Sequence, residues 1–99
     1  RGSHEGTKMK ATHGWDSCGN GINSSGFGAL PAGIRSSNGL FYDLGLSTHY
    51  WSTTEYVKIT THAFNRQLDY NQPYIGWFQA SHYYGYPKDF GFSVRCVKD

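Results

Sequence analysis

The sequence predicts a small α+β domain that is mostly β-strand and loop, with little helix. Aromatic residues make up 17% of the 99 residues and glycine occupies 13 positions, whereas only 16% of the residues are charged. A disordered chain would be poorer in aromatic side chains and richer in charge. No segment has the apolar spacing of an amphipathic helix, while other segments alternate with the two-residue period of strands. We therefore expect one domain over residues 1–99.

Charge and hydropathy exclude two classes of partner. The net charge of +2 at pH 7 is too small to indicate nucleic-acid binding. No apolar stretch approaches the roughly 20 residues of a membrane span. We expect neither nucleic acid as a partner nor direct insertion into a membrane.

The first half of the chain predicts irregular backbone and one hairpin. Residues 1–4 fit a tag remnant or native sequence equally well, and turn-forming residues dominate 5–26, with Trp15 packed inside. Residues 27–33 form an apolar run broken by glycine and proline, which predicts a short buried strand followed by a bend. The Asn38-Gly39 pair between Ile34 and residues 40–42 predicts a β-hairpin.

The second half predicts longer strands. Residues 50–56 are β-prone throughout. Residues 62–70 alternate, so we expect the even-numbered side chains from Phe64 to Tyr70 on one face and the odd-numbered ones from Ala63 to Asp69 on the other. A turn at 71–73 then leads into a returning strand at 74–78. At the C-terminal end, Phe92, Val94 and Cys96 share one apolar face, which is typical of a central strand.

The predicted core contains the large apolar residues of these segments. We expect the scaffold to be formed by Trp15, Phe27, Leu30, Trp51, Phe92 and Val94.

Residues 74–86 have the composition of a binding surface. Six of these thirteen residues are aromatic and none is Asp, Glu, Lys or Arg. Tyrosine and tryptophan supply large contact areas at low entropic cost, and the same rings stack on sugars. The alternative is that these rings form the core of a chain that has few aliphatic residues. We expect the following residues of 62–87 to contact a ligand: Phe64, Asn65, Gln67, Asp69, Gln72, Tyr74, Trp77, Phe78, His82, Tyr83, Tyr84 and Tyr86.

The sequence favours neither a metal site nor catalysis. The five histidines show no spacing typical of zinc ligands, and no cluster of oxygen donors indicates calcium. Cys96 lies on an apolar strand face, where a thiol is inert. We expect no cofactor, no metal and no enzymatic activity. Cys18 and Cys96 either form a disulfide that closes a long loop or are free thiols, or one of them pairs with a cysteine outside residues 1–99.

Three segments together resemble a known family. They are residues 25–33 with Arg35, residues 50–56 and residues 91–97, and their order is similar to that of the Fibrobacter succinogenes major paralogous domain. The resemblance implies a C-type-lectin-like fold related to the formylglycine-generating enzyme. It also implies that residues 1–99 are the C-terminal part of a larger domain, and that the last cysteine pairs upstream of this segment rather than with Cys18.

The resemblance also implies a function. The family is a bacterial surface module, and it is similar to the variable proteins of diversity-generating retroelements, in which the stretch equivalent to 62–87 is a display surface. We therefore expect an extracellular or cell-surface adhesin-like module that binds a protein or glycan on another surface. The alternative is a structural module of a larger surface protein, whose aromatic residues pack against a neighbouring domain.

Overall fold

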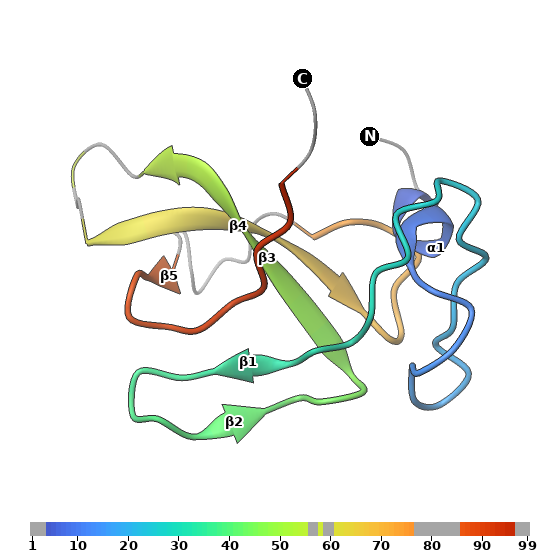
Figure 1. Ribbon diagram of the computed structural model, residues 1–99, viewed down its shortest axis with the longest axis horizontal. Coiled ribbons are helices and arrows are strands. Elements are labelled where there is room, and N and C mark those ends of the chain that lie inside the picture. Colours follow the sequence, from blue (N-terminus) through green and yellow to red (C-terminus); the bar gives the residue numbers. More distant parts are fainter. Residues whose placement is uncertain (1–3, 56–57, 59–60, 77–85, 97–99) are drawn as a thin grey trace.

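The computed structural model describes residues 4–55, 58, 61–76 and 86–96 (Figure 1). This part of the chain is mostly strand and loop with one short helix, as the composition predicted. No helix in it is long and apolar enough to cross a membrane. The elements are α1 (Glu5–Met9), β1 (Ile34–Arg35), β2 (Phe41–Tyr42), β3 (Ser47–Glu55), β4 (His62–Asp69) and β5 (Tyr86–Pro87).

The main sheet is antiparallel, with the strand order β3-β4-β5. Its long β3–β4 pair aligns Thr48 with Leu68 and Trp51 with Asn65, and the register shifts between Trp51 and Glu55. β3 is rich in threonine and aromatic residues, which fit a pleated surface well. The expectation that residues 62–70 alternate between two faces is confirmed by this register, because residues directly opposite each other share a face.

The predicted hairpin is confirmed as the second sheet, β1–β2. Gly39 has a φ of +87°, a conformation that favours glycine. The Asn38 side-chain oxygen accepts a hydrogen bond from the Leu40 amide at 3.0 Å. The Asn-Gly pair therefore closes the turn through both backbone conformation and side-chain capping.

Residues 91–93 connect the two sheets. The C-terminal segment runs between β1 and β3, where Gly91 bridges Arg35 and Ser93 bridges Tyr50 (Figure 1). A further bridge, from Gly33 to Thr48, joins the start of β1 to β3 directly. The predicted central position of this segment is confirmed. The predicted apolar strand face is wrong beyond Phe92, because Val94 is 74% exposed and Cys96 is also exposed. In the described residues, the bridges of this segment to β3 end at Ser93, which leaves Val94 without a sheet to cover it.

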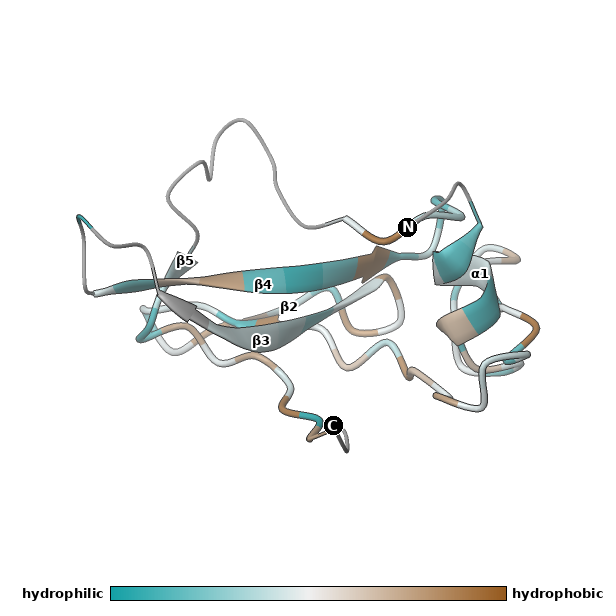
Figure 2. Ribbon diagram, turned by 90° about the horizontal axis from the view of Figure 1, so that it is seen from above, coloured by the Kyte–Doolittle hydropathy of each residue, from teal (hydrophilic) through white to brown (hydrophobic). Residues whose placement is uncertain are grey.

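α1 and the N-terminal loops lie beside one end of the β3–β4 pair (Figure 2), and the core joins the two, since it contains Trp15 of the loops and Leu68 of β4. It consists of Trp15, Ala29 and Leu68, against which half-buried apolar side chains pack. The Trp15 indole nitrogen donates a hydrogen bond to the Ala29 carbonyl at 3.0 Å. The predicted packing of Trp15 inside the N-terminal region is therefore confirmed. The half-buried side chains are Met9, Phe27, Tyr50, Tyr70 and Ile75.

Leu30 does not join this core, contrary to expectation. Ala29 occupies the buried position and bridges Lys10, so the next side chain turns outward and Leu30 is 50% exposed. Residues 27–33 form isolated bridges at Ala29 and Gly33 rather than a strand. The strand predicted to return along β4 after the 71–73 turn is confirmed at Gly76, which forms an antiparallel bridge with Gln67.

Cys18 and Cys96 are both free and exposed, so the disulfide between them is not formed. Cys18 lies in a tight turn that is closed by a 2.8 Å hydrogen bond from the Gly19 amide to the Asp16 carbonyl. Cys96 follows the point at which the C-terminal segment leaves the sheet. Their separation in sequence therefore gave no guide to their pairing.

Candidate functional site

The two faces of the β3-β4-β5 sheet differ in character. Tyr50 and Leu68 point into the core on one face. His49 lies opposite Gln67, and Ala63 lies opposite Tyr86, on the other face. We call this second side the aromatic face, because rings from β3, β5 and the C-terminal segment meet on it.

Five rings form a continuous cluster on the aromatic face. Phe92 stacks on His49 with ring centroids 4.8 Å apart, and its centroid lies 4.4 Å from that of Trp51. Tyr86 meets Phe92 edge-on at 5.0 Å, and Phe90 lies 5.4 Å from Tyr86. Such offset and edge-on arrangements are the favourable ones for aromatic pairs. We refer to His49, Trp51, Tyr86, Phe90 and Phe92 as the ring cluster.

The ring cluster is buried at its base and open at its rim. His49 is buried, whereas the other four rings are half-buried. The backbone holds Phe92 in place, because the Ser93 amide donates to the His49 carbonyl at 2.9 Å and the Trp51 amide donates to the Ser93 carbonyl at 3.2 Å. The rings are therefore fixed relative to one another before any ligand arrives, which lowers the entropic cost of binding.

Polar groups border the ring cluster along β4. The Gln67 amide donates to both carboxylate oxygens of Asp69, at 2.9 and 3.1 Å. Burial raises the pKa of the Tyr86 hydroxyl, and the negative charges of Asp69 and Asp43 raise it further. Tyr86 therefore stays protonated well into the alkaline range. The aromatic face combines rings with an amide, a carboxylate and a phenol.

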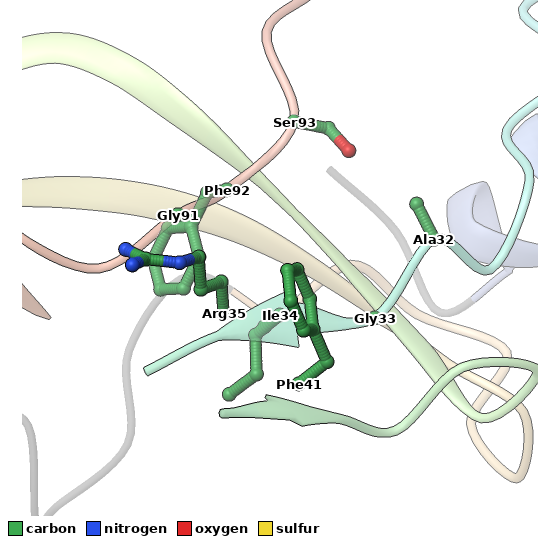
Figure 3. Close-up of a pocket in the computed structure, with 8 residues that line it drawn as sticks. All are labelled: Ala32, Gly33, Ile34, Arg35, Phe41, Gly91, Phe92 and Ser93. Carbon is green, nitrogen blue, oxygen red and sulfur yellow. The ribbon is translucent and has the colours of Figure 1, made fainter. Parts of the chain in front are cut away.

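A pocket of about 260 Å³ lies next to the ring cluster, between β1 and residues 91–93 (Figure 3). Phe92 and Arg35 form one part of its lining, and Ile34 and Phe41 form another. Gly91 packs tightly here, since a Cβ added to it would lie 2.9 Å from the Cβ of Arg35.

A second, polar pocket of about 300 Å³ lies where the N-terminal segment meets the turn after β4. Lys10 on its wall is buried, and its ammonium donates to the carbonyls of Asp69 at 3.0 Å and Gln72 at 3.2 Å. It also lies 5.2 Å from the centroid of the Trp15 ring. Burial lowers the pKa of Lys10, and the charge of Asp69 opposes that shift. Lys10 thus holds the turn in place.

The structure separates the residues predicted to contact a ligand. Gln67, Asp69 and Tyr86 lie together on the aromatic face. Asn65 shares that face but is only 6% exposed, because Trp51 lies opposite it in the sheet, so it is not at the surface as expected. Phe64 lies on the opposite face of β4, since its neighbours in sequence face the ring cluster.

The remaining predicted contacts lie beyond the sheet or outside the described residues. Tyr74 is exposed and Gln72 is half-buried, and both follow the end of β4. The other five lie outside the residues that the structure describes; they are Trp77, Phe78, His82, Tyr83 and Tyr84.

Sequence reasoning missed four members of the ring cluster as surface residues. His49 and Phe90 were not singled out for binding, and Trp51 and Phe92 were expected in the core. A signal was present, because His49 and Trp51 are two residues apart, as are Phe90 and Phe92, and this is the spacing of side chains on one strand face. Among the described residues, no group of three histidine, cysteine, aspartate or glutamate side chains could hold a metal ion.

Comparison with known proteins identifies the family. The model of the Fibrobacter succinogenes major domain matches residues 1–98, so the chain belongs to this family. No curated protein and no solved structure gives a significant match.

Proposed function

We propose that this member of the Fibrobacter succinogenes major domain family is a ligand-binding module without catalytic activity, and that its aromatic face is the binding surface. One observation carries the proposal: a half-buried ring cluster lies beside the hydrogen-bonded Gln67–Asp69 pair on one side of the sheet. The opposite side of the same sheet packs the core.

The chemistry of this face suits recognition. Aromatic rings with polar tips dominate the energetics of binding surfaces, and a rim of hydrogen-bonding groups orients the ligand. Tyr86 joins both parts, since its ring packs on Phe92 while its hydroxyl is protonated at neutral pH. A ring face for apolar contact beside an amide and a carboxylate fits either a sugar or a protein surface.

The family resemblance extends the proposal to fold and location. We infer a C-type-lectin-like arrangement, in which residues 62–87 supply the variable part of the surface and residues 91–93 the fixed part. The contact of Tyr86, from the first segment, with Phe92, from the second, supports this division. The module would act at the bacterial cell surface or outside the cell, on a protein or glycan carried by another surface.

The test is a binding screen with the folded chain. The labelled protein is applied to immobilised glycans and, separately, to solubilised bacterial surface proteins. Tyr86→Ala should weaken any binding found by about 30-fold or more, equivalent to about 2 kcal/mol for a residue at the centre of a binding surface. Tyr86→Phe keeps the ring and should lose less.

Arg66→Ala is the matched control, because Arg66 is exposed on β4 but points to the other face of the sheet. It should leave binding unchanged. Thermal melts of each variant separate lost contacts from lost folding. Equal losses for Arg66→Ala and Tyr86→Ala in folded protein would refute the aromatic face as the binding surface.

A further inference from the structure

A second surface of the molecule is unusually apolar. Around β2, Phe41 is 78% exposed and Leu44 is 79% exposed. Leu40 and Tyr42 are exposed too, but side chains alternate along a strand, so these two point to the opposite side from Phe41. Leu30 is exposed nearby, since it lines a pocket together with Leu44. Contiguous exposed apolar side chains of this size mark interaction surfaces. We call Leu30, Phe41 and Leu44 the hairpin patch, because these three line neighbouring hollows.

Two hollows adjoin the protruding side chains of the hairpin patch. The pocket beside Phe41 has a volume of about 260 Å³ (Figure 3). A larger one of about 560 Å³ is lined by Leu30, Pro31 and Leu44. Ala32 lines both, so the two hollows are neighbours on one surface. The same patch thus offers knobs and holes, which is the property that a self-complementary interface needs.

Charges of opposite sign flank the hairpin patch. Arg35 is exposed and lines the smaller hollow, toward the hairpin turn. Asp43, directly after β2, is exposed, and Asp16, also exposed, lines the larger hollow. Two copies of the patch placed antiparallel would bring the positive end of each against the negative end of the other. Parallel placement would oppose like charges, which is unfavourable.

The strand order leaves an edge for this contact. Among the described strands, β2 pairs only with β1. An edge strand with no inward charge is a template for pairing with another chain.

We propose that the hairpin patch binds a second copy of this chain in a two-fold symmetric dimer, with the two β2 strands antiparallel. Phe41 and Leu44 of each copy fill the hollows of the other, and Arg35 of each copy faces the acidic end of the other. The contact is independent of the aromatic face, and the dimer would present two such faces.

Sedimentation equilibrium of the purified chain over the micromolar to millimolar range tests the proposal. The wild type should show a reversible monomer–dimer equilibrium. Phe41→Glu and Leu44→Glu should each weaken dimerisation at least tenfold, because each buries a charge in an apolar contact. Ile22→Glu is the matched control, since Ile22 is also an exposed apolar residue but lies outside the hairpin patch. It should dimerise like the wild type.

Substitutions at Arg35 test the proposed pairing of opposite charges across the dimer. Arg35→Glu should weaken the dimer at least tenfold, whereas Arg35→Lys should retain it. Circular dichroism confirms that each variant is folded, which is expected because the changed side chains are exposed. A wild-type chain that stays monomeric throughout, or a dimer that Phe41→Glu and Leu44→Glu leave intact, would overturn the proposal.

Discussion

Lys10 is the residue that ties the N-terminal segment to the end of β4. Its ammonium donates to the carbonyls of Asp69 and Gln72 from a buried position. Hydrogen bonds from a charged donor contribute more to stability than neutral ones, and a buried carbonyl left without a donor is costly. The sequence offered no sign of this role, because a lysine in a polar N-terminal segment is normally solvated.

Replacing Lys10 should therefore destabilise the fold. We expect Lys10→Met to lower the free energy of unfolding by about 2 kcal/mol in urea denaturation, since two carbonyls lose a charged donor. Lys8→Met is the control, because Lys8 is exposed on α1, two residues before Lys10. It should change the free energy of unfolding by less than about 0.5 kcal/mol. Similar losses for both variants would show that Lys10 does not hold the turn.

Tyr86 should make stability depend on alkaline pH. Its pKa is raised in the folded chain by burial and by Asp69 and Asp43, so the folded state holds the phenol proton more tightly than the unfolded state does. The resulting stabilisation is fully present below the ordinary pKa of 10.0 and is lost as the pH rises through the folded value. Lys10, whose pKa is lowered, contributes with the opposite sign over the alkaline range.

Comparing the pH dependence of stability in the wild type and in Tyr86→Phe isolates the contribution of the Tyr86 hydroxyl. The difference in unfolding free energy between wild type and Tyr86→Phe should be constant at neutral pH and shrink as the pH rises above about 10. Both proteins contain Lys10, so its titration cancels. A difference that does not change with pH would contradict the raised pKa. Asp69→Asn removes one of the two negative charges that raise the pKa of Tyr86, so the pH-dependent loss of stability should be complete at a lower pH.

At the scale of elements, Gly33 determines how the hairpin joins the main sheet. Gly33 has a φ of +73° and bridges Thr48, and an added Cβ would collide with the Tyr42 carbonyl. Gly26 has a similar φ of +76°, but its added Cβ would meet no described atom within 4 Å. The two positions therefore share a left-handed conformation that is strained for alanine, and they differ in steric contact.

Alanine at these two positions should have unequal effects. Gly26→Ala should cost about 1 kcal/mol, the price of a left-handed alanine. Gly33→Ala should cost at least about 2 kcal/mol more, because the collision forces β1 away from β2. Thermal or urea denaturation of the two variants measures the difference. Equal losses would mean that the β1–β2 junction adapts freely.

The elements show which sequence signals were reliable. The Asn-Gly hairpin and the alternation of residues 62–70 were predicted because each depends on local chemistry: one on a turn conformation, the other on the pleat. The C-terminal segment was predicted only in part. Its central position followed from its apolar residues, but isolated bridges, rather than a regular ladder, hold it, and these depend on contacts with Arg35 and Tyr50 from distant parts of the chain.

The candidate site was predictable to a similar degree. Gln67, Asp69 and Tyr86 were identified from residue type, and they lie together on one face. Phe64 was assigned to the same surface although the predicted alternation already placed it on the other face of β4. The two-residue spacings of His49 with Trp51 and of Phe90 with Phe92 were visible in the sequence. That the two pairs meet depends on the packing of Phe92 between β3 and β5, a tertiary contact that the spacings do not reveal.

At the scale of the whole molecule, the chain divides its aromatic residues between two tasks. Trp15, Phe27 and Tyr50 pack with Leu68 on one face of the sheet, where aliphatic residues are too few to fill the core. The ring cluster lies on the other face, with its rim open. Of residues 74–86, for which the sequence left core and surface open, the structure describes 74–76 and 86, where Tyr74 is exposed and Tyr86 is half-buried.

The central claim is that the aromatic face, rather than another exposed surface, binds the ligand. Hydroxyl-radical footprinting with mass spectrometry tests it most directly, because it reports the solvent accessibility of individual side chains. The probe is the glycan or surface protein that binds in the screen above. Bound ligand should protect Trp51, Tyr86 and Phe90 from oxidation, while Phe41 and the core residue Tyr50 should react as in the free protein. Protection of Phe41 with an unchanged ring cluster would contradict the claim.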